Sequence, residues 1–388
     1  MATPVYDYSR EIRSLMGKKK KKQKFQIPTP QEDIPINTQP PRMETMPEDL
    51  KQKRLLLERR GERSRLIKQL EEDRGSRIIC YFTAERQNFG TIVSSDDTLP
   101  LFFEHLKSFK KVKNIDLFLY TRGGHTLSSN RIVHLLREFC EKLTVLIPFR
   151  AHSAGTILAL GGDEIVMGPM GELGPVDPSV SNVFNPLTDE KDLKKGTIPI
   201  SVEDVSAYMA LIKEKGLSDA TVFSTGLKAL TDRVHPLALG NVHRQYLLIR
   251  TLSKRLLELH MKGEEKERIE KIVEILSEKL YYHGYQISRH EAKEIIGLNV
   301  TYPPENAEQL MWDLYIEYRN ALSPGEEFDF NRLLGNRESG DFFMDSAIIE
   351  SVDLVHSFQY ALNVKRKKPG INEFDVNVKK MGWEKLEA

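Results

Sequence analysis

Short apolar runs alternate with amphipathic stretches through the middle of the chain. The runs RIICYFT (77–83), IDLFLYT (115–121) and LTVLIPF (143–149) are apolar on both faces, which predicts buried strands. The stretch 97–109 and the segment that follows Ile132 carry apolar residues at helical spacing, which is typical of amphipathic helices. Buried strands that alternate with such helices predict an α/β fold, with a mostly parallel sheet covered on both faces.

Helical periodicity dominates the chain after residue 200. It predicts helices over 201–216, 238–261, 265–282 and 305–321. Little periodicity follows the last of these helices. We therefore expect residues 301–388 to form a helical C-terminal extension that ends in a tail.

The N-terminal part differs from the rest in composition. Residues 1–50 hold seven of the nineteen prolines and a run of five lysines at 18–22, which predicts a disordered basic arm. Residues 51–75 predict a charged helix with a narrow apolar stripe. Residues 1–75 carry 18 basic and 12 acidic side chains, whereas the other 313 residues carry 39 and 44. A basic arm is thus joined to a mildly acidic body, and it either docks a partner or an anionic surface or keeps the protein soluble.

The bulk composition excludes several classes of protein. A net charge of +1 disfavours a strongly basic nucleic-acid binder and an acidic chaperone-like protein. No apolar run approaches the roughly 18 residues that span a membrane, and the first twenty residues lack a secretory h-region, so we expect a cytoplasmic protein. The two cysteines, Cys80 and Cys140, lie in apolar patterns and are expected to be buried thiols. No histidine pair has the spacing of a zinc site, and the sequence implies no metal and no cofactor.

Two motifs lie where parallel sheets place their sites, at the carboxyl ends of strands. The first is Arg122-Gly123-Gly124-His125, which follows the strand 115–121. Glycines there let backbone N–H groups face outward toward a developing anion, although a Gly-Gly exit is also common in tight turns.

The second motif is Ala151-His152-Ser153-Ala154-Gly155, which follows the strand 143–149. A serine at a strand-to-helix turn has its hydroxyl beside free helix N–H groups, which favours a nucleophile with an adjacent oxyanion hole. The alternative is that Ser153 only caps the helix.

The two motifs together resemble a known group of proteins. TRGGHTLSSNRIVHLL is similar to the Gly-Gly segment of the Clp protease/crotonase fold, and RAHSAGTILALGGDEIVMGPMGELGPVDP is similar to the nucleophile helix and following loop of the signal peptide peptidase A group. With KALTDRVHPLALGNVHR and HGYQISRHEAKEIIGL, the chain resembles the serine dehydrogenase proteinase family over roughly residues 77–300. The resemblance implies a Clp-like peptidase domain over residues 76–300, and a homo-oligomer.

The resemblance also implies roles for individual residues. Ser153 matches the nucleophile, and the backbone N–H groups of Gly124 and Ala154 match the oxyanion pair, with Gly123 as the alternative in the same turn. The chain departs from a Clp-type triad because no histidine lies between His152 and His235, which leaves a Ser-Lys dyad. The candidate lysines are Lys191, Lys194, Lys195, Lys213, Lys215 and Lys228.

We choose Lys228 as the general base because its neighbours are apolar and small and because it precedes a helix, as the base lysine does in the related group. His235 is the alternative base, or else a polar residue that ends a loop before Pro236. The resulting hypothesis is a cytoplasmic serine endopeptidase that hydrolyses peptide or protein substrates. Two other hypotheses remain: a non-catalytic Clp-fold scaffold or regulator, and a crotonase-type acyl-CoA enzyme with Glu172 as its acidic residue.

Overall fold

The computed structural model describes residues 56–84, 97–176, 179–180, 182–188, 196–214, 220–282, 284–323, 329–367 and 373–386. The chain divides into two compact units, Met1–Thr45 and Met46–Ala388, and every described residue belongs to the second. The predicted disordered arm over residues 1–50 and its lysine run therefore lie outside the described residues.

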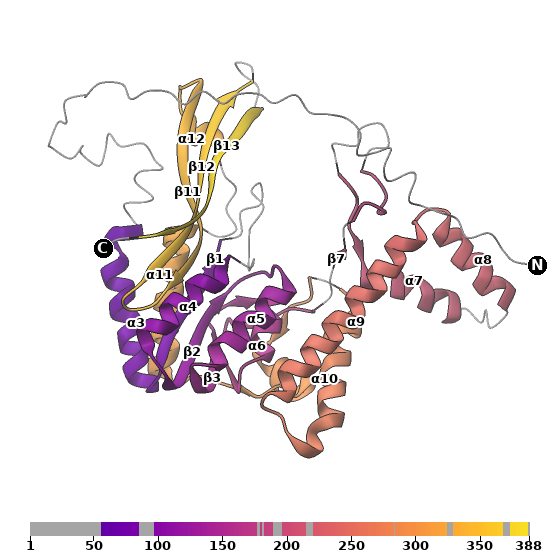
Figure 1. Ribbon diagram of the computed structural model, residues 1–388, viewed down its shortest axis with the longest axis horizontal. Helices are drawn as coiled ribbons and strands as arrows, with labels where there is room; N and C mark the ends of the chain where they lie inside the picture. The colour runs from indigo at the N-terminus through magenta and orange to yellow at the C-terminus, as the bar shows by residue number, and fades with distance from the viewer. Residues whose placement is uncertain are drawn as a thin grey trace, which may run out of the picture. The chain divides into compact units, whose positions relative to one another are not determined.

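The described strands form an eight-stranded sheet with the order β10-β5-β3-β2-β1-β11-β12-β13 (Figure 1). Neighbours from β10 to β1 pair in parallel, and the pairs from β1 to β13 are antiparallel. The α/β fold with a mostly parallel sheet in its core is thus confirmed. The strands are β1 (Arg77–Thr83), β2 (Val112–Tyr120), β3 (Cys140–Ile147), β5 (Glu164–Met167), β10 (Val300–Thr301), β11 (Ser339–Glu350), β12 (Val355–Arg366) and β13 (Phe374–Lys385).

Helices cover both faces of the parallel strands. One face packs in the largest apolar cluster against α4, α5 and α6, with α9 and α10 outside them (Figure 1). Cys140 belongs to this cluster and Cys80 to the opposite one, so the prediction of two buried free thiols is confirmed. The helices of this face are α4 (Thr98–Phe109), α5 (Thr126–Arg137), α6 (Ala154–Leu160), α9 (Pro236–Glu258) and α10 (Lys266–Glu278).

The other face of the sheet packs on α3 (Arg60–Arg74) and α11 (Glu305–Leu322). A buried ion pair fixes the charged helix α3 to the end of β11, because Arg63 Nε donates to Glu350 Oε2 at 2.7 Å. Tyr318 Oη of α11 donates to the same carboxylate oxygen at 2.8 Å. Both charges lie away from water, so removal of either partner would leave an uncompensated buried charge.

The C-terminal region corrects the prediction of a helical extension over residues 301–388. The last helix among the described residues is α12 (Phe330–Leu334), and the strands β11, β12 and β13 that follow are antiparallel and have their own apolar cluster. Register shifts leave one extra residue in β11, Ser346, and one in β13, Lys379. An extra residue reverses which side chains face inward, so the period of two is broken in β11 and β13, whereas β12 keeps it at Phe358, Tyr360, Leu362 and Val364.

Two buried imidazoles tie the C-terminal strands to α4. His105 Nδ1 lies 2.8 Å from Ser351 Oγ, and His105 Nε2 lies 3.1 Å from His356 Nδ1. His356 Nε2 lies 3.2 Å from Glu104 Oε2, and Glu104 also pairs with Lys385. Burial lowers the pKa of His105 to about 3 and also lowers the pKa of His356, so both rings are neutral at pH 7. One choice of tautomers lets each group in this row donate a hydrogen bond to the next, from Ser351 through His105 and His356 to the Glu104 carboxylate.

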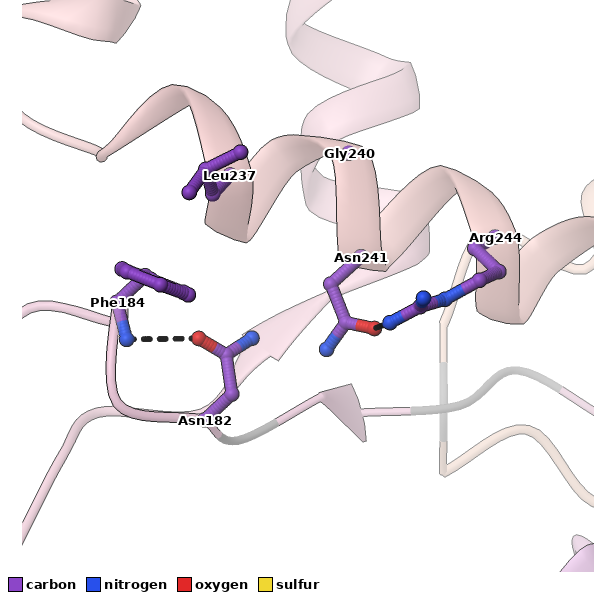
Figure 2. Close-up of a pocket in the computed structure, with 6 residues that line it drawn as sticks. All are labelled: Asn182, Phe184, Leu237, Gly240, Asn241 and Arg244. Atoms are coloured by element: carbon purple, nitrogen blue, oxygen red, sulfur yellow. Dashed lines mark hydrogen bonds between the residues drawn. The ribbon is translucent and has the colours of Figure 1, made fainter. Parts of the chain in front are cut away.

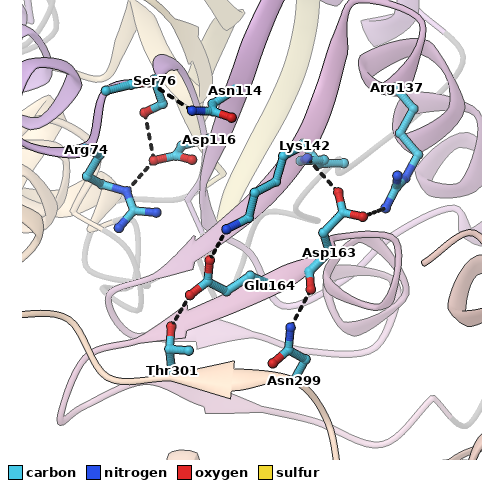
Figure 3. A network of polar contacts seen from close by, with 12 residues as sticks. Arg74, Ser76, Asn114, Asp116, Arg137, Lys142, Asp163, Glu164, Asn299 and Thr301 are labelled. Carbon is cyan, nitrogen blue, oxygen red and sulfur yellow. Dashed lines mark hydrogen bonds and ion pairs between the residues drawn. The ribbon is translucent and has the colours of Figure 1, made fainter. Parts of the chain in front are cut away.

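Polar side chains join the parallel strands at the edge opposite to their carboxyl ends (Figure 3). Arg74 at the end of α3 pairs with the buried Asp116 of β2. Lys142 of β3 pairs with Glu164 of β5 at 2.6 Å, and Thr301 Oγ1 of β10 donates to the same carboxylate at 2.6 Å. These groups satisfy one another between neighbouring strands, so they stabilise the strand pairing.

A peripheral segment leads from β7 (Ser179–Val180) and β8 (Ile200–Ser201) into α7 (Val202–Glu214) and α8 (Ala220–Thr231) before α9 begins. α7 packs on α8 and on α9, whereas the described part of α8 contains no buried residue. Across the described ranges, no helix combines the length and the apolar character that a membrane span requires.

Candidate active site

Strands β2 and β3 bring the two sequence motifs together. Beyond the ends of these strands, Thr121 forms a parallel bridge with Ala151. Thr121 N–H donates to Arg150 O at 2.9 Å, and His152 N–H donates to Thr121 O at 2.9 Å. The Gly-Gly turn and the serine turn therefore lie side by side at the carboxyl edge of the sheet, as the motifs predicted.

Ser153 occupies the turn between the strand edge and α6. Its backbone has φ +52° and ψ −113°, in a region that residues with a side chain rarely adopt. The serine stands at the N-cap position, but its side chain makes no capping hydrogen bond. Within the described residues Ser153 Oγ has no hydrogen-bond partner at all, so helix capping does not explain this hydroxyl.

The Gly-Gly turn contacts the serine directly. A Cβ atom placed on Gly123 would lie 2.9 Å from Ser153 Cβ and 3.3 Å from Ser153 Oγ, so only glycine fits there. Gly123 has φ +128° and Gly124 has φ +150°, both in the positive region that glycine tolerates. The close approach explains why the turn carries no side chain at this position.

The backbone amides of the turn have different partners. Gly123 N–H donates to Thr121 Oγ1 at 3.1 Å and is occupied. Thr121 Oγ1 is held in turn by Thr83 Oγ1, 3.0 Å away, at the end of β1. Among the described residues no acceptor engages Gly124 N–H or Ala154 N–H, and the latter belongs to the first, unpaired turn of α6.

The side chain of Glu172 lies beside the residue that precedes the serine. His152 Nε2 lies 3.1 Å from Glu172 Oε1, and the same oxygen accepts from Arg150 Nε at 2.8 Å. Burial raises the pKa of Glu172, but its contacts with His152 and Arg150 outweigh burial and leave the pKa lowered. Glu172 is therefore a carboxylate at neutral pH, with Arg150 and His152 beside it.

A small three-stranded sheet supports the serine turn from the other side. It consists of β4 (Arg150–Ala151), β6 (Glu172–Leu173) and β9 (Ile287–Ser288). Thr156 Oγ1 of α6 lies 2.9 Å from Ala151 O and 2.8 Å from Gly174 O, and it accepts from Gly174 N–H. The first turn of α6 is thus fixed to both β4 and the loop after β6.

Lys228 does not meet Ser153 within the described chain. It lies inside α8, and the helix predicted after it follows as α9 from Pro236. Its side chain is 74% exposed and pairs with Asp232 one turn later, with Nζ 3.0 Å from Oδ2. α8 packs on α7, and Figure 1 shows both helices beside the start of α9 rather than beside α6.

His235 serves as the N-cap of α9. Its Nδ1 accepts from Leu237 N–H at 3.1 Å, and its ring stacks on Phe184 with centroids 5.0 Å apart. The capping contact agrees with the simpler interpretation of a polar residue that ends the loop. Of the other lysine candidates, Lys191, Lys194, Lys195 and Lys215 lie outside the described residues, and Lys213 is exposed on α7.

The structure also identifies residues that sequence reasoning missed. Thr121 occupies the Gly123 amide and so leaves Gly124 as the available donor of that turn. Gly155 packs on Thr121, where an added Cβ would approach Thr121 Cγ2 to 2.5 Å. The Ala-Gly pair after the serine carried a signal for this close packing, whereas nothing in the sequence singled out a threonine at a strand end.

The chain is similar in sequence or in structure to several known proteins. Two uncharacterised proteins of Methanocaldococcus jannaschii are similar to the chain. One is 28% identical over 263 residues, which is 65% of this chain and 78% of the relative. The other is 30% identical over 170 residues, which is 42% of this chain and 56% of the relative. Among solved structures, a mutant of the 1510-N membrane-bound stomatin-specific protease aligns with 55% of this chain and 76% of its own, at 16% identity and a TM-score of 0.33.

The family model of the ClpP-like SDH-type serine proteinases matches residues 45–233. This range contains the Gly-Gly turn, the serine turn and α8. The predicted resemblance is confirmed over this range, because residues 45–233 match the model of the ClpP-like SDH-type serine proteinases.

Proposed function

We propose that the protein is a serine endopeptidase in which Ser153 is the nucleophile. Ser153 Oγ attacks the peptide carbonyl, and the N–H groups of Gly124 and Ala154 stabilise the oxyanion that forms. The observation that carries this proposal is the strained serine at an N-cap, whose hydroxyl neither caps the helix nor has another described partner. A strained backbone conformation that is not compensated by a local hydrogen bond is typical of functional sites.

The oxyanion assignment rests on which amides have partners. Gly123 N–H donates to Thr121, whereas Gly124 N–H and Ala154 N–H find no acceptor among the residues that the structure describes. Such donors are oriented before the substrate arrives, so they stabilise developing charge without reorganisation.

Lys228 is proposed as the general base, supplied to Ser153 by a second copy of the chain. It takes the serine proton during attack and later returns it to the leaving amine. α8 carries exposed Phe223 and Leu227, and its described part has no buried residue, so this apolar helix has surface to bury on a partner. Burial favours the neutral form that a basic lysine requires. His235 remains the alternative base.

A fluorophosphonate probe tests the nucleophile. The full-length protein should be labelled, and Ser153→Ala should abolish both labelling and peptide hydrolysis. Thr156→Ser, a buried hydroxyl of the same helix, is the matched control and should keep the label on Ser153. If the folded protein is not labelled under conditions that label a related peptidase, the peptidase proposal fails and a scaffold or regulatory role is favoured.

A mixing experiment tests the base. Ser153→Ala and Lys228→Ala should each be inactive alone, and copies mixed after mild dissociation should regain activity, because one copy provides the serine and the other the lysine. Activity in Lys228→Ala alone contradicts the dyad. Two inactive variants that stay inactive after proven exchange of copies would show that the lysine does not act between copies.

A further inference from the structure

A cavity of about 360 Å³ lies between the start of α9 and the turn that precedes it in the chain (Figure 2). Nothing in the proposed hydrolysis uses it. Its lining residues are Asn182, Phe184, Leu237, Gly240, Asn241 and Arg244.

One side of the cavity is a single stripe of α9. Leu237, Gly240, Asn241 and Arg244 follow the i, i+3, i+4, i+7 spacing of one helix face. Gly240 leaves the middle of this stripe open, because a Cβ atom placed on it meets no heavy atom within 4 Å. The stripe thus offers an apolar end at Leu237, a gap and a cationic end.

The opposite side is a turn of fixed geometry. Asn182 Oδ1 accepts from Phe184 N–H at 2.8 Å, and Asn185 Nδ2 donates to Ile198 O at 2.9 Å. The Phe184 ring is stacked on His235, the N-cap of α9, so the turn and the helix start are joined on their apolar side.

The polar atoms that remain available in the cavity are hydrogen-bond donors. Asn182 uses its oxygen on Phe184, and Asn241 uses its oxygen on Arg244, so both amide groups keep their NH₂ donors. The two amide nitrogens point toward each other across the gap in Figure 2. Asn182 Nδ2 is buried and has no hydrogen-bond partner among the described residues, and none of the six lining residues is acidic.

We propose that this cavity binds the carboxy-terminal end of a peptide whose last side chain is apolar. The α-carboxylate accepts hydrogen bonds from the amides of Asn182 and Asn241 and from the Arg244 guanidinium. A planar guanidinium matches the geometry of a carboxylate. The last side chain lies on Phe184 and Leu237 above the open Gly240. Peptide cleavage creates a new C-terminal carboxylate each time, so the proposed function would supply these peptide ends. In this respect the inference rests on the proposed function.

The experiment uses the full-length Ser153→Ala protein, so that no peptide is cleaved during the measurement. The ligand is a fluorescent, N-acylated pentapeptide that ends in leucine, and its C-terminal amide is the matched control. We expect the free acid to bind about tenfold more tightly than the amide, the usual effect of a charge-assisted hydrogen bond. Arg244→Gln should remove this preference.

Filling the cavity gives a second measurement. Gly240→Leu places a side chain in the open part of the stripe and should weaken binding of the free acid by about tenfold or more. Gly61→Leu is the matched control, because Gly61 is also a helical glycine with nothing within 4 Å of an added Cβ, and it should bind as the parent does.

Several outcomes would overturn the inference. They are equal binding of the acid and the amide, the absence of saturable binding at about 1 mM peptide, and tighter binding of free octanoate than of the peptide acid. If the wild-type protein is neither labelled by fluorophosphonate nor active on peptides while the Ser153→Ala protein still prefers the free acid, the proposed function fails and this inference stands.

Discussion

The serine turn and the α7–α8 segment lie within the same range that the family model matches, yet they differ in burial. Ser153 follows a buried strand, touches Gly123 and precedes a helix in which every residue is buried. Lys228 sits on a helix whose described part has no buried residue, and its partner Asp232 is also exposed. Folding of one chain therefore fixes Ser153 and the amides of Gly124 and Ala154, whereas the described contacts hold Lys228 only by its exposed pair with Asp232.

This difference in burial between Ser153 and Lys228 indicates how the proposed site would be regulated. A nucleophile without a base reacts slowly, so a chain alone would hold a formed but inactive site. Association that buries α8 would then complete the dyad and lower the water content around it in one step. A peptidase built this way is active only where copies meet.

The largest expected effect is a difference in the free energy of unfolding between a buried leucine near the serine turn and an exposed leucine on α8. Leu146→Ala removes a buried side chain of β3, the strand that leads to Ser153, and should lower the free energy of unfolding by about 2–5 kcal/mol. Leu227→Ala on α8 removes an exposed side chain and should change it by about 0.5 kcal/mol or less. Urea unfolding at a dilution where the protein is a single copy measures both.

A large loss of stability in the diluted Leu227→Ala variant would contradict the contrast, because it would show that α8 is packed within one chain. The same variant at high concentration gives a further check. If α8 docks on a second copy, the leucine should matter more as association increases.

The next effect concerns the turn itself. Gly123→Ala places a Cβ atom 2.9 Å from Ser153 Cβ on a backbone with φ +128°, so the serine turn must shift. We expect kcat/KM for peptide hydrolysis to fall by about 100-fold, as for other small displacements of catalytic groups. Gly61→Ala in α3 is the control and should keep full activity, since nothing lies near that position. Wild-type activity in Gly123→Ala would mean that the contact is not needed for catalysis.

The sequence predicted this half of the site because local rules determine it. A buried strand followed by Gly123-Gly124, and another followed by Ser153, place both turns at one edge of a parallel sheet. The buried runs also predicted β1, β2 and β3, because a strand covered on both faces has no polar positions. A glycine where two backbone segments approach closely and a serine at the start of a helix can both be recognised from a short stretch of sequence.

The other half depended on contacts that no short segment contains. Lys228 has small and apolar neighbours, as a buried base would, but those neighbours are exposed on α8. In β11 and β13 one extra residue breaks the alternation, whereas β12 alternates at Phe358, Tyr360, Leu362 and Val364, a strand signal that the prediction of a helical extension overlooked. Thr121 depends on the register between two strand ends, which the sequence of either strand does not determine.

A smaller effect comes from the buried imidazoles that join α4 to the C-terminal strands. Burial holds the pKa of His105 at about 3, well below the value of about 6.5 in the unfolded chain, so the unfolded state binds the proton first. Stability from this group is complete above pH 7 and falls as the pH drops from about 6.5 toward 3, by up to about 1.4 kcal/mol for each pH unit.

His105→Gln tests this dependence because glutamine keeps hydrogen-bonding groups but does not titrate. Urea unfolding between pH 7.5 and 5 should show a steeper loss in the wild type than in the variant. The groups that face the imidazole are Ser351, His356, Glu104 and Lys385. Parallel curves for the two proteins would mean that the pKa of His105 is the same in the folded and the unfolded chain.

The smallest expected effect is at the lysine itself, and it bears directly on the comparison of the two regions. Asp232→Asn removes the charge that Lys228 pairs with while preserving size, and exposed pairs one helical turn apart are worth about 0.3–0.5 kcal/mol. We expect the free energy of unfolding of the single copy to change by no more than that, and the change to shrink at high salt. A loss above about 1 kcal/mol that persists in salt would mean that the pair is buried in solution and that the lysine is fixed by the fold of one chain after all.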